Sequence, residues 1–107
     1  MGNLENKKCR ACEGEADLLS KESIQNFISQ IKEWNLNKNK IEKNFEFKNF
    51  KEALDFVNKV GEIAESEGHH PDIKIFDWNK VKISTHTHSL GGLSENDFIL
   101  AFKIDKI

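Results

Sequence analysis

At 107 residues the chain has the length of one small domain, which can bury a core without a metal or a disulfide. Its 16 basic and 18 acidic residues give a formal net charge of -2 and form no basic stripe, so nucleic acid is not an expected partner. No apolar run approaches the roughly 18 residues that a membrane span needs, and no apolar signal-peptide core follows the N-terminus. We therefore expect a soluble, cytoplasmic protein that does not bind membranes, while organelle targeting stays open.

The first 19 residues differ in pattern from the rest of the chain. They show no hydrophobic periodicity and mix lysine, glutamate, glycine and asparagine, which is typical of a flexible N-terminal extension. We predict that one folded domain covers residues 20–107. Cys9 and Cys12 lie in the extension, and two cysteines are too few for a disulfide framework. We interpret them as reduced thiols, and the alternatives are a zinc site shared with two histidines or a redox pair.

A first helix is predicted to begin after Ser20, whose side chain can accept hydrogen bonds from the first-turn amides. Apolar residues then recur at helical spacing, at Ile24, Phe27, Ile28 and Ile31. Beyond Trp34 lies a polar turn rich in asparagine and lysine, and apolar and polar residues alternate after it. This alternation predicts a first β-hairpin with apolar positions at Ile41, Phe45 and Phe47.

A second helix is predicted from the longest apolar stripe of the sequence, at Phe50, Ala53, Leu54, Val57, Val60 and Ala64. Asn49 and Glu52 resemble a capping box at its start, and Gly68 is a natural end. Two short alternating segments follow, at residues 73–75 and 81–83. They predict a second hairpin that turns around residues 77–79.

Gly91 and Gly92 break the chain before a last helix. That helix opens with Ser94 and Asp97 in capping-box spacing and carries Phe98, Ala101 and Phe102 on one face. The element order is therefore α-β-β-α-β-β-α. Such amphipathic elements predict an α+β fold, in which three helices pack on one face of a four-stranded antiparallel sheet. We expect the other face to be solvated or buried in an oligomer.

The four histidines all fall between positions 69 and 88. Imidazole titrates at about pH 6.5, so it can donate and accept protons near neutrality and suits general acid–base catalysis. Pro71 biases His70 toward an extended backbone, so the rings of His69 and His70 are expected to point in different directions. The alternative is that this pair only ends a helix. Near the glycine-rich loop His88 is the better candidate, and we interpret His86 as a solvent-facing strand residue.

Two carboxylates and two tryptophans are further candidates, and each has a structural alternative. Glu65 lies one helical turn before His69, where its carboxylate can face the same cleft and bind an amidine or guanidine edge. On its own, however, Glu65 is typical of an exposed helix surface. Asp97 has a role as a helix cap in any case. Trp34 and Trp78 are more often core or interface anchors than platforms for a planar heterocycle.

Taken together, these positions resemble the signature of the pterin-4a-carbinolamine dehydratase family, also known as the dimerisation cofactor of a homeodomain transcription factor. The shared spacing is Glu65-x3-His69-His70-Pro71-x6-Trp78-x9-His88-x8-Asp97. The resemblance extends from about Ser20 to Ile104, and Trp34 matches a further aromatic position. A match at seven positions over 33 residues is far more specific than a histidine pair alone.

The resemblance implies a lyase that dehydrates 4a-hydroxytetrahydropterin to the quinonoid dihydropterin, in tetrahydropterin recycling, without a metal or other cofactor. It implies that His69, His70 and His88 are the catalytic residues. His69 and His88 would form the acid–base pair, and His70 would hold the substrate and tune the site. Substrate-orienting roles are implied for Glu65 and Asp97. Trp34 and Trp78 are expected at the substrate site by the same resemblance.

Two properties of partners follow from the same resemblance. Family members point to a homodimer or homotetramer, which would cover a sheet face that one chain leaves open. Relatives also stabilise a transcription factor dimer, so a non-enzymatic protein-binding module is the alternative function. An enzyme should lose activity when His69 or His88 is replaced, whereas a binding module should tolerate those changes.

Overall fold

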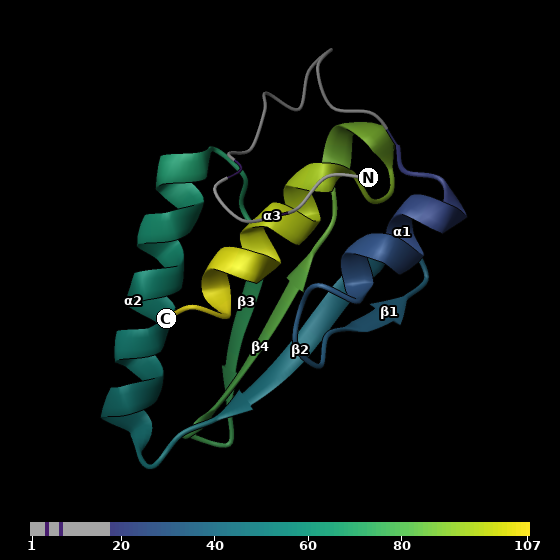
Figure 1. Cartoon of the computed structure of the whole chain (residues 1–107). Coiled ribbons are helices and arrows are strands. Elements are labelled where there is room, and N and C mark those ends of the chain that lie inside the picture. Colours follow the sequence, from purple (N-terminus) through teal and green to yellow (C-terminus); the bar gives the residue numbers. More distant parts are fainter. Residues whose placement is uncertain (1–3, 5–6, 8–17) are drawn as a thin grey trace.

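The structure, a computed structural model, describes Leu4, Lys7 and residues 18–107 (Figure 1). Over these residues the chain follows the predicted order α-β-β-α-β-β-α, with a short 3-10 turn added before the last helix. The elements are α1 (Lys21–Ile28), β1 (Asn35–Asn37), β2 (Lys40–Glu46), α2 (Phe50–Glu67), β3 (Asp72–Phe76), β4 (Lys80–Thr85), the turn η1 (His88–Leu90) and α3 (Glu95–Ile104).

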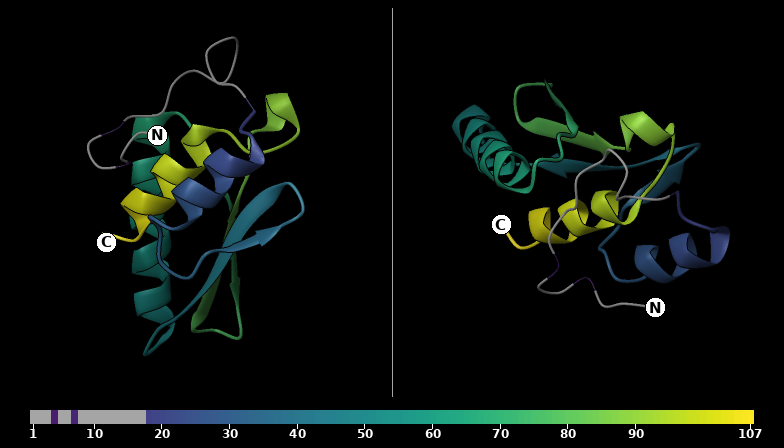
Figure 2. Two further views of the ribbon diagram at one scale, coloured as in Figure 1. Left: turned by 45° about the vertical axis from the view of Figure 1, so that its right-hand side comes forward. Right: turned by 90° about the horizontal axis from the view of Figure 1, so that it is seen from above.

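The described strands form one antiparallel sheet of four strands in the order β1-β2-β4-β3. Each hairpin pairs within itself, and β2 pairs with β4 to join the two hairpins, so that Ile41 lies opposite Thr85. The helices of the described part all lie on one face of this sheet (Figure 2). The predicted α+β fold class is therefore confirmed.

Side chains along β4 alternate between the face of the sheet that the helices cover and the open face. Val81 and Ile83 are fully buried under the helices, whereas Lys80 and Lys82 between them are only partly buried. The open face is charged, and the Lys82 Nζ lies 3.5 Å from a carboxylate oxygen of Glu42 on the neighbouring strand. Such a pair between partly exposed side chains adds little stability, but a charged face suits contact with water.

Local capping signals set the ends of the helices. The side chain of Asn49 accepts a hydrogen bond from the Glu52 amide at the start of α2, and Ser20 caps α1 through Ser23 in the same way. At the end of α2, Gly68 adopts a left-handed conformation with φ 67°, which glycine takes without steric cost. This turn reverses the chain direction immediately before His69.

The core fills the space between the sheet and the helices. Phe27 of α1 stacks on Phe98 of α3 with ring centroids 5.6 Å apart. Leu4 is fully buried in the same core, and its amide donates to Gln30 Oε1 at 3.0 Å. Lys7 pairs with Glu95 at 2.9 Å. The division of the chain at Ser20 stays a prediction, and Cys9 and Cys12 lie outside the described residues, as does any site they would form.

Candidate active site

A fully buried carboxylate, that of Asp97, stands at the centre of the candidate site. Asp97 occupies the first turn of α3, where it forms a capping box with Ser94. Its Oδ2 accepts the Ser94 amide proton at 3.0 Å. A negative charge at a helix N-terminus is favoured by the helix dipole, which helps to offset the cost of burial.

The carboxylate of Asp97 also makes hydrogen bonds with three other side chains. Oδ1 lies 2.7 Å from both Thr85 Oγ1 and His69 Nε2, and Oδ2 lies 2.9 Å from Thr87 Oγ1. Thr87 Oγ1 is in turn 2.6 Å from Ser94 Oγ. We call these residues the Asp97 cluster: Asp97, His69, Thr85, Thr87 and Ser94.

The Asp97 cluster joins three segments that are distant in sequence. Thr85 ends β4 on the face that carries the buried Val81 and Ile83. Thr87 lies two residues further on and bridges to Gly92, with its amide donating to the Gly92 carbonyl at 2.8 Å. The cluster therefore fixes the end of β4, the start of α3 and the segment before β3 relative to one another.

The hydrogen-bond pattern determines what His69 can do toward Asp97. Both threonine hydroxyls and the Ser94 amide donate to the carboxylate, so both of its oxygens act as acceptors. The Nε2 of His69 lies 2.7 Å from Oδ1, and in the tautomer that carries a proton on this nitrogen it donates to the carboxylate. A carboxylate that holds one imidazole nitrogen in this way fixes both the tautomer and the orientation of the ring.

His70 points away from the Asp97 cluster, as expected from Pro71. Its Nε2 lies 2.6 Å from Glu65 Oε1, and the two side chains are 62% and 80% exposed. Its neighbour His69 is buried against Asp97. Glu65 thus pairs with His70 and not with His69. The two adjacent histidines present one anchored and one solvent-facing imidazole.

His88 begins the turn η1 and is exposed, while His86 is half-buried just beyond β4. Their ring centroids are 4.1 Å apart with an interplanar angle of 59°. Thr87 lies between them in sequence and is anchored to Asp97. His88 is therefore connected to the same buried carboxylate as His69, through the backbone of one residue. His86, interpreted from the sequence as a solvent-facing strand residue, thus lies just outside the strand and is half-buried.

Neither tryptophan lies beside the histidines within the described chain. Trp34 is 5% exposed, and its indole Nε1 donates to Asp105 at 3.0 Å. Asp105 caps the far end of α3, about 12 Å along the helix from Asp97. Trp78 is 61% exposed at the β3–β4 turn, a strand length of roughly 17 Å from His70. The prediction that Trp34 and Trp78 contact the substrate stays a prediction.

Asp105 organises a second set of buried contacts. Besides Trp34, its carboxylate accepts hydrogen bonds from the Lys32 amide at 3.0 Å and from Lys43 Nζ at 3.1 Å. We call these residues the Asp105 cluster: Asp105, Lys32, Trp34 and Lys43. The side chains of Lys43 and Asp105 are 14% and 7% exposed, so this ion pair is largely shielded from water.

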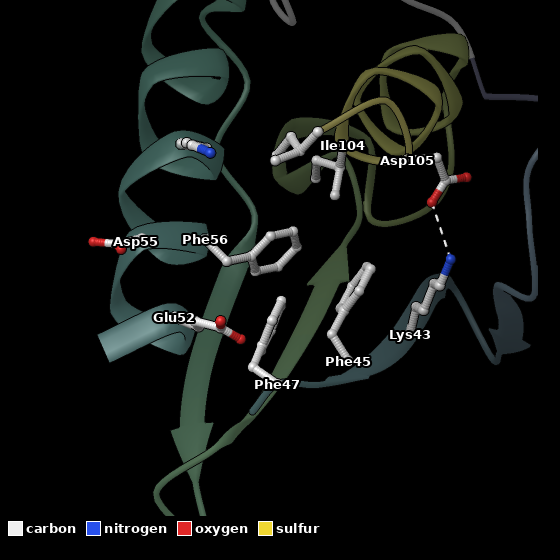
Figure 3. Close-up of a pocket in the computed structure, with 10 residues that line it drawn as sticks. Lys43, Phe45, Phe47, Glu52, Asp55, Phe56, Ile104 and Asp105 are labelled. Carbon is white, nitrogen blue, oxygen red and sulfur yellow. Dashed lines mark hydrogen bonds and ion pairs between the residues drawn. The ribbon is translucent and has the colours of Figure 1, made fainter. Parts of the chain in front are cut away.

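A cavity of about 410 Å³ adjoins the Asp105 cluster, between α2, β2 and the end of α3 (Figure 3). Phe45, Phe47 and Phe56 turn their rings toward one another along it, with Phe56 at 4.6 and 4.9 Å from the other two ring centroids. No histidine lines this cavity. The acid–base candidates therefore do not border this aromatic space.

Sequence reasoning missed Thr85 and Thr87 as members of the site. The signal was present, because Thr85 continues the buried series of Val81 and Ile83 and a buried hydroxyl needs a partner. Across the described residues, no group of three or more histidine, cysteine, aspartate or glutamate side chains could hold a metal ion. No helix in the described ranges is long and apolar enough to cross a membrane.

Comparisons with known proteins identify a family model and relatives that match this chain. The sequence model described as pterin 4 alpha carbinolamine dehydratase matches residues 17–107. A relative from Alkaliphilus metalliredigens that carries the name of this dehydratase is 49% identical over 108 aligned residues, covering 99% of this chain and 96% of its own. The mitochondrial pterin-4-alpha-carbinolamine dehydratase 2 of Arabidopsis thaliana is 43% identical and matches all of this chain over 60% of its own length.

A solved structure is also similar. The transcriptional coactivator/pterin dehydratase of Brucella melitensis superposes with a TM-score of 0.79 at 26% sequence identity, covering 84% of this chain and 97% of that protein. The residues matched by the sequence model include the whole Asp97 cluster, His70 and His88.

Proposed function

The chain belongs to the pterin 4 alpha carbinolamine dehydratase family, and from this premise we propose that it dehydrates 4a-hydroxytetrahydropterin to the quinonoid dihydropterin. The histidines around the Asp97 cluster carry this reaction. The observation that supports it most directly is the 2.7 Å hydrogen bond between His69 and the fully buried Asp97. A buried carboxylate that orients an imidazole is an arrangement suited to proton transfer.

The chemistry requires two proton transfers and no net oxidation. The C4a–O bond breaks as the hydroxyl gains a proton and leaves as water. The proton on N5 is lost, and its bonding electrons form the new C4a=N5 double bond. One group must therefore donate a proton and another must accept one, and two imidazoles can fill both roles near neutral pH.

His69 and His88 form the proposed acid–base pair. Asp97 holds the ring of His69 through Nε2, and Thr87 ties the backbone next to His88 to the same carboxylate. The ring of His69 and the backbone that carries His88 thus belong to a single framework around Asp97. Fixed placement matters because proton transfer needs hydrogen-bond distances to the reacting atoms.

His70 and Glu65 hold the substrate in this proposal. Their side chains form an exposed imidazole–carboxylate pair beside the anchored ring of His69. A pterin presents a planar edge of ring nitrogens and an amino group, and a carboxylate can accept two hydrogen bonds from such an edge. The pair therefore supplies exposed polar contacts for the substrate, while the Asp97 cluster next to it is buried.

The wider setting of the enzyme is part of the same proposal. We place the reaction in tetrahydropterin recycling, in the cytoplasm. We also infer a homodimer or homotetramer, because Phe50 and Leu54 lie one turn apart on α2 and remain 49% and 40% exposed. Neighbouring apolar side chains of this size favour burial against another copy.

The test replaces each proposed acid–base residue singly. His69→Ala and His88→Ala should each lower the dehydration rate of 4a-hydroxytetrahydropterin by about 10²- to 10⁴-fold, since general acid–base groups contribute that much. Lys74→Ala, an exposed change on β3, is the matched control and should keep the wild-type rate. Circular dichroism and light scattering establish that each variant keeps its fold and assembly. If both histidine variants work at the wild-type rate, the chain is not a dehydratase of this mechanism, and a binding module becomes the better interpretation.

A further inference from the structure

His86 was not expected to take part in the site, yet its ring lies against His88. The two ring centroids are 4.1 Å apart, and the planes are tilted by 59°. His86 is half-buried, whereas His88 is exposed. At this separation the rings are in van der Waals contact, within the range in which aromatic pairs attract one another.

The three histidines of the proposed site differ in how they are held. His69 is bound by Asp97 and His70 by Glu65, each through one carboxylate oxygen. Within the described part of the structure, the His88 side chain makes no hydrogen bond, and it packs against the ring of His86. An exposed imidazole without a hydrogen-bond partner can otherwise rotate among several side-chain conformers.

The backbone of this segment is fixed independently of the two rings. Thr87, which separates them, is fully buried, donates to Asp97 and pairs with Gly92. Residues on either side of one extended residue project in the same direction. The fold thus holds the backbone of His86 and His88 at a constant distance, and the half-buried ring of His86 limits the positions open to the ring of His88.

We propose that His86 is a positioning residue for His88. The packing of its ring takes the place of the carboxylate that holds each of the other two imidazoles. This inference rests on the proposed function, because it assumes that His88 transfers a proton. His86 needs no contact with the substrate and transfers no proton itself. The property required at position 86 is therefore a flat ring of this size, and not an imidazole nitrogen.

The experiment measures kcat and KM for dehydration of 4a-hydroxytetrahydropterin in four purified variants. These are His86→Ala, His86→Phe, His88→Ala and the double variant His86→Ala/His88→Ala. Packing of one aromatic pair predicts that His86→Ala lowers kcat about three- to tenfold with KM nearly unchanged. His86→Phe keeps the ring and should restore kcat to within about twofold of the wild type. In the absence of His88, the change at position 86 should have no further effect.

Each other outcome overturns the inference in a recognisable way. If His88→Ala loses activity but His86→Ala matches the wild type, positioning by His86 is wrong while the proposed function stands. If His86→Phe is as slow as His86→Ala, or the double variant is slower than His88→Ala, the imidazole of His86 acts on the substrate directly. Wild-type activity in His88→Ala overturns the proposed function together with this inference. Thermal unfolding of every variant separates a loss of fold from these results.

Discussion

An aspartate stands at each end of helix α3, with Asp97 fully buried and Asp105 largely shielded, and the two differ in what they bind. Asp97 in the first turn accepts hydrogen bonds from an imidazole, two threonine hydroxyls and a backbone amide. Asp105 at the C-cap accepts them from an ammonium group, an indole and a backbone amide. Asp97 thus has four donor groups and Asp105 has three, and both carboxylates are largely shielded from water.

The difference lies in whether the partner can exchange a proton near neutral pH. Lysine and indole hold their protons there, so the Asp105 cluster can only tie β2 and the chain after α1 to the end of α3. Imidazole can gain or lose a proton, so the Asp97 cluster can take part in chemistry. The helix dipole separates them as well, because it favours the charge of Asp97 and opposes that of Asp105, which Lys43 offsets. Of these two carboxylates, that of Asp97 is therefore the one whose side-chain partner can exchange a proton near neutral pH.

Replacing Asp97 by asparagine should give the largest effect. The amide keeps the shape but loses the charge, and its NH₂ group would face donors where the carboxylate accepted them. We expect a loss of about 3 kcal/mol in the free energy of unfolding. The dehydration rate per folded molecule should fall by on the order of 10²-fold, because the orientation of His69 is lost. Urea unfolding and rates corrected for the folded fraction measure both quantities, and an unchanged rate would contradict the role of Asp97.

Asp105→Asn is the matched variant at the other end of the helix. It removes the charge partner of the largely shielded Lys43 and should lower the free energy of unfolding by about 2 kcal/mol. The rate per folded molecule should stay within about twofold of the wild type, since no proposed acid–base group contacts Asp105. The same unfolding and rate measurements apply. A rate loss as large as that of Asp97→Asn would mean that the two ends of α3 do not differ in function.

Signals that act over a few residues predicted the fold well. Asn49, Gly68 and Ser94 mark helix ends through contacts with their own neighbours, so their roles can be read without knowing the tertiary structure. The effect of Pro71 on His70 is also local. The strands were predicted from alternating apolar and polar residues. This pattern is present because one face of the sheet is covered by helices and the other is charged.

Such local signals could not predict contacts between segments that are distant in sequence. The bonds of Thr85 and Thr87 to Asp97 depend on how β4 meets α3, and the packing of His86 on His88 depends on where the strand ends. Trp34 can border a ligand or the core with the same sequence pattern, and its hydrogen bond to Asp105 joins residues 71 positions apart, which no local signal predicts.

The most direct test of the account asks at which end of α3 a pterin binds. An unreactive dihydropterin can be titrated into isotopically labelled protein while NMR follows the histidine ring signals and the indole N–H of Trp34, which reports on the Asp105 cluster. We expect the ring signals of His69, His70 and His88 to change and the Trp34 signal to stay in place. A moving Trp34 signal with unchanged histidine signals would contradict the assignment of the site to the Asp97 cluster.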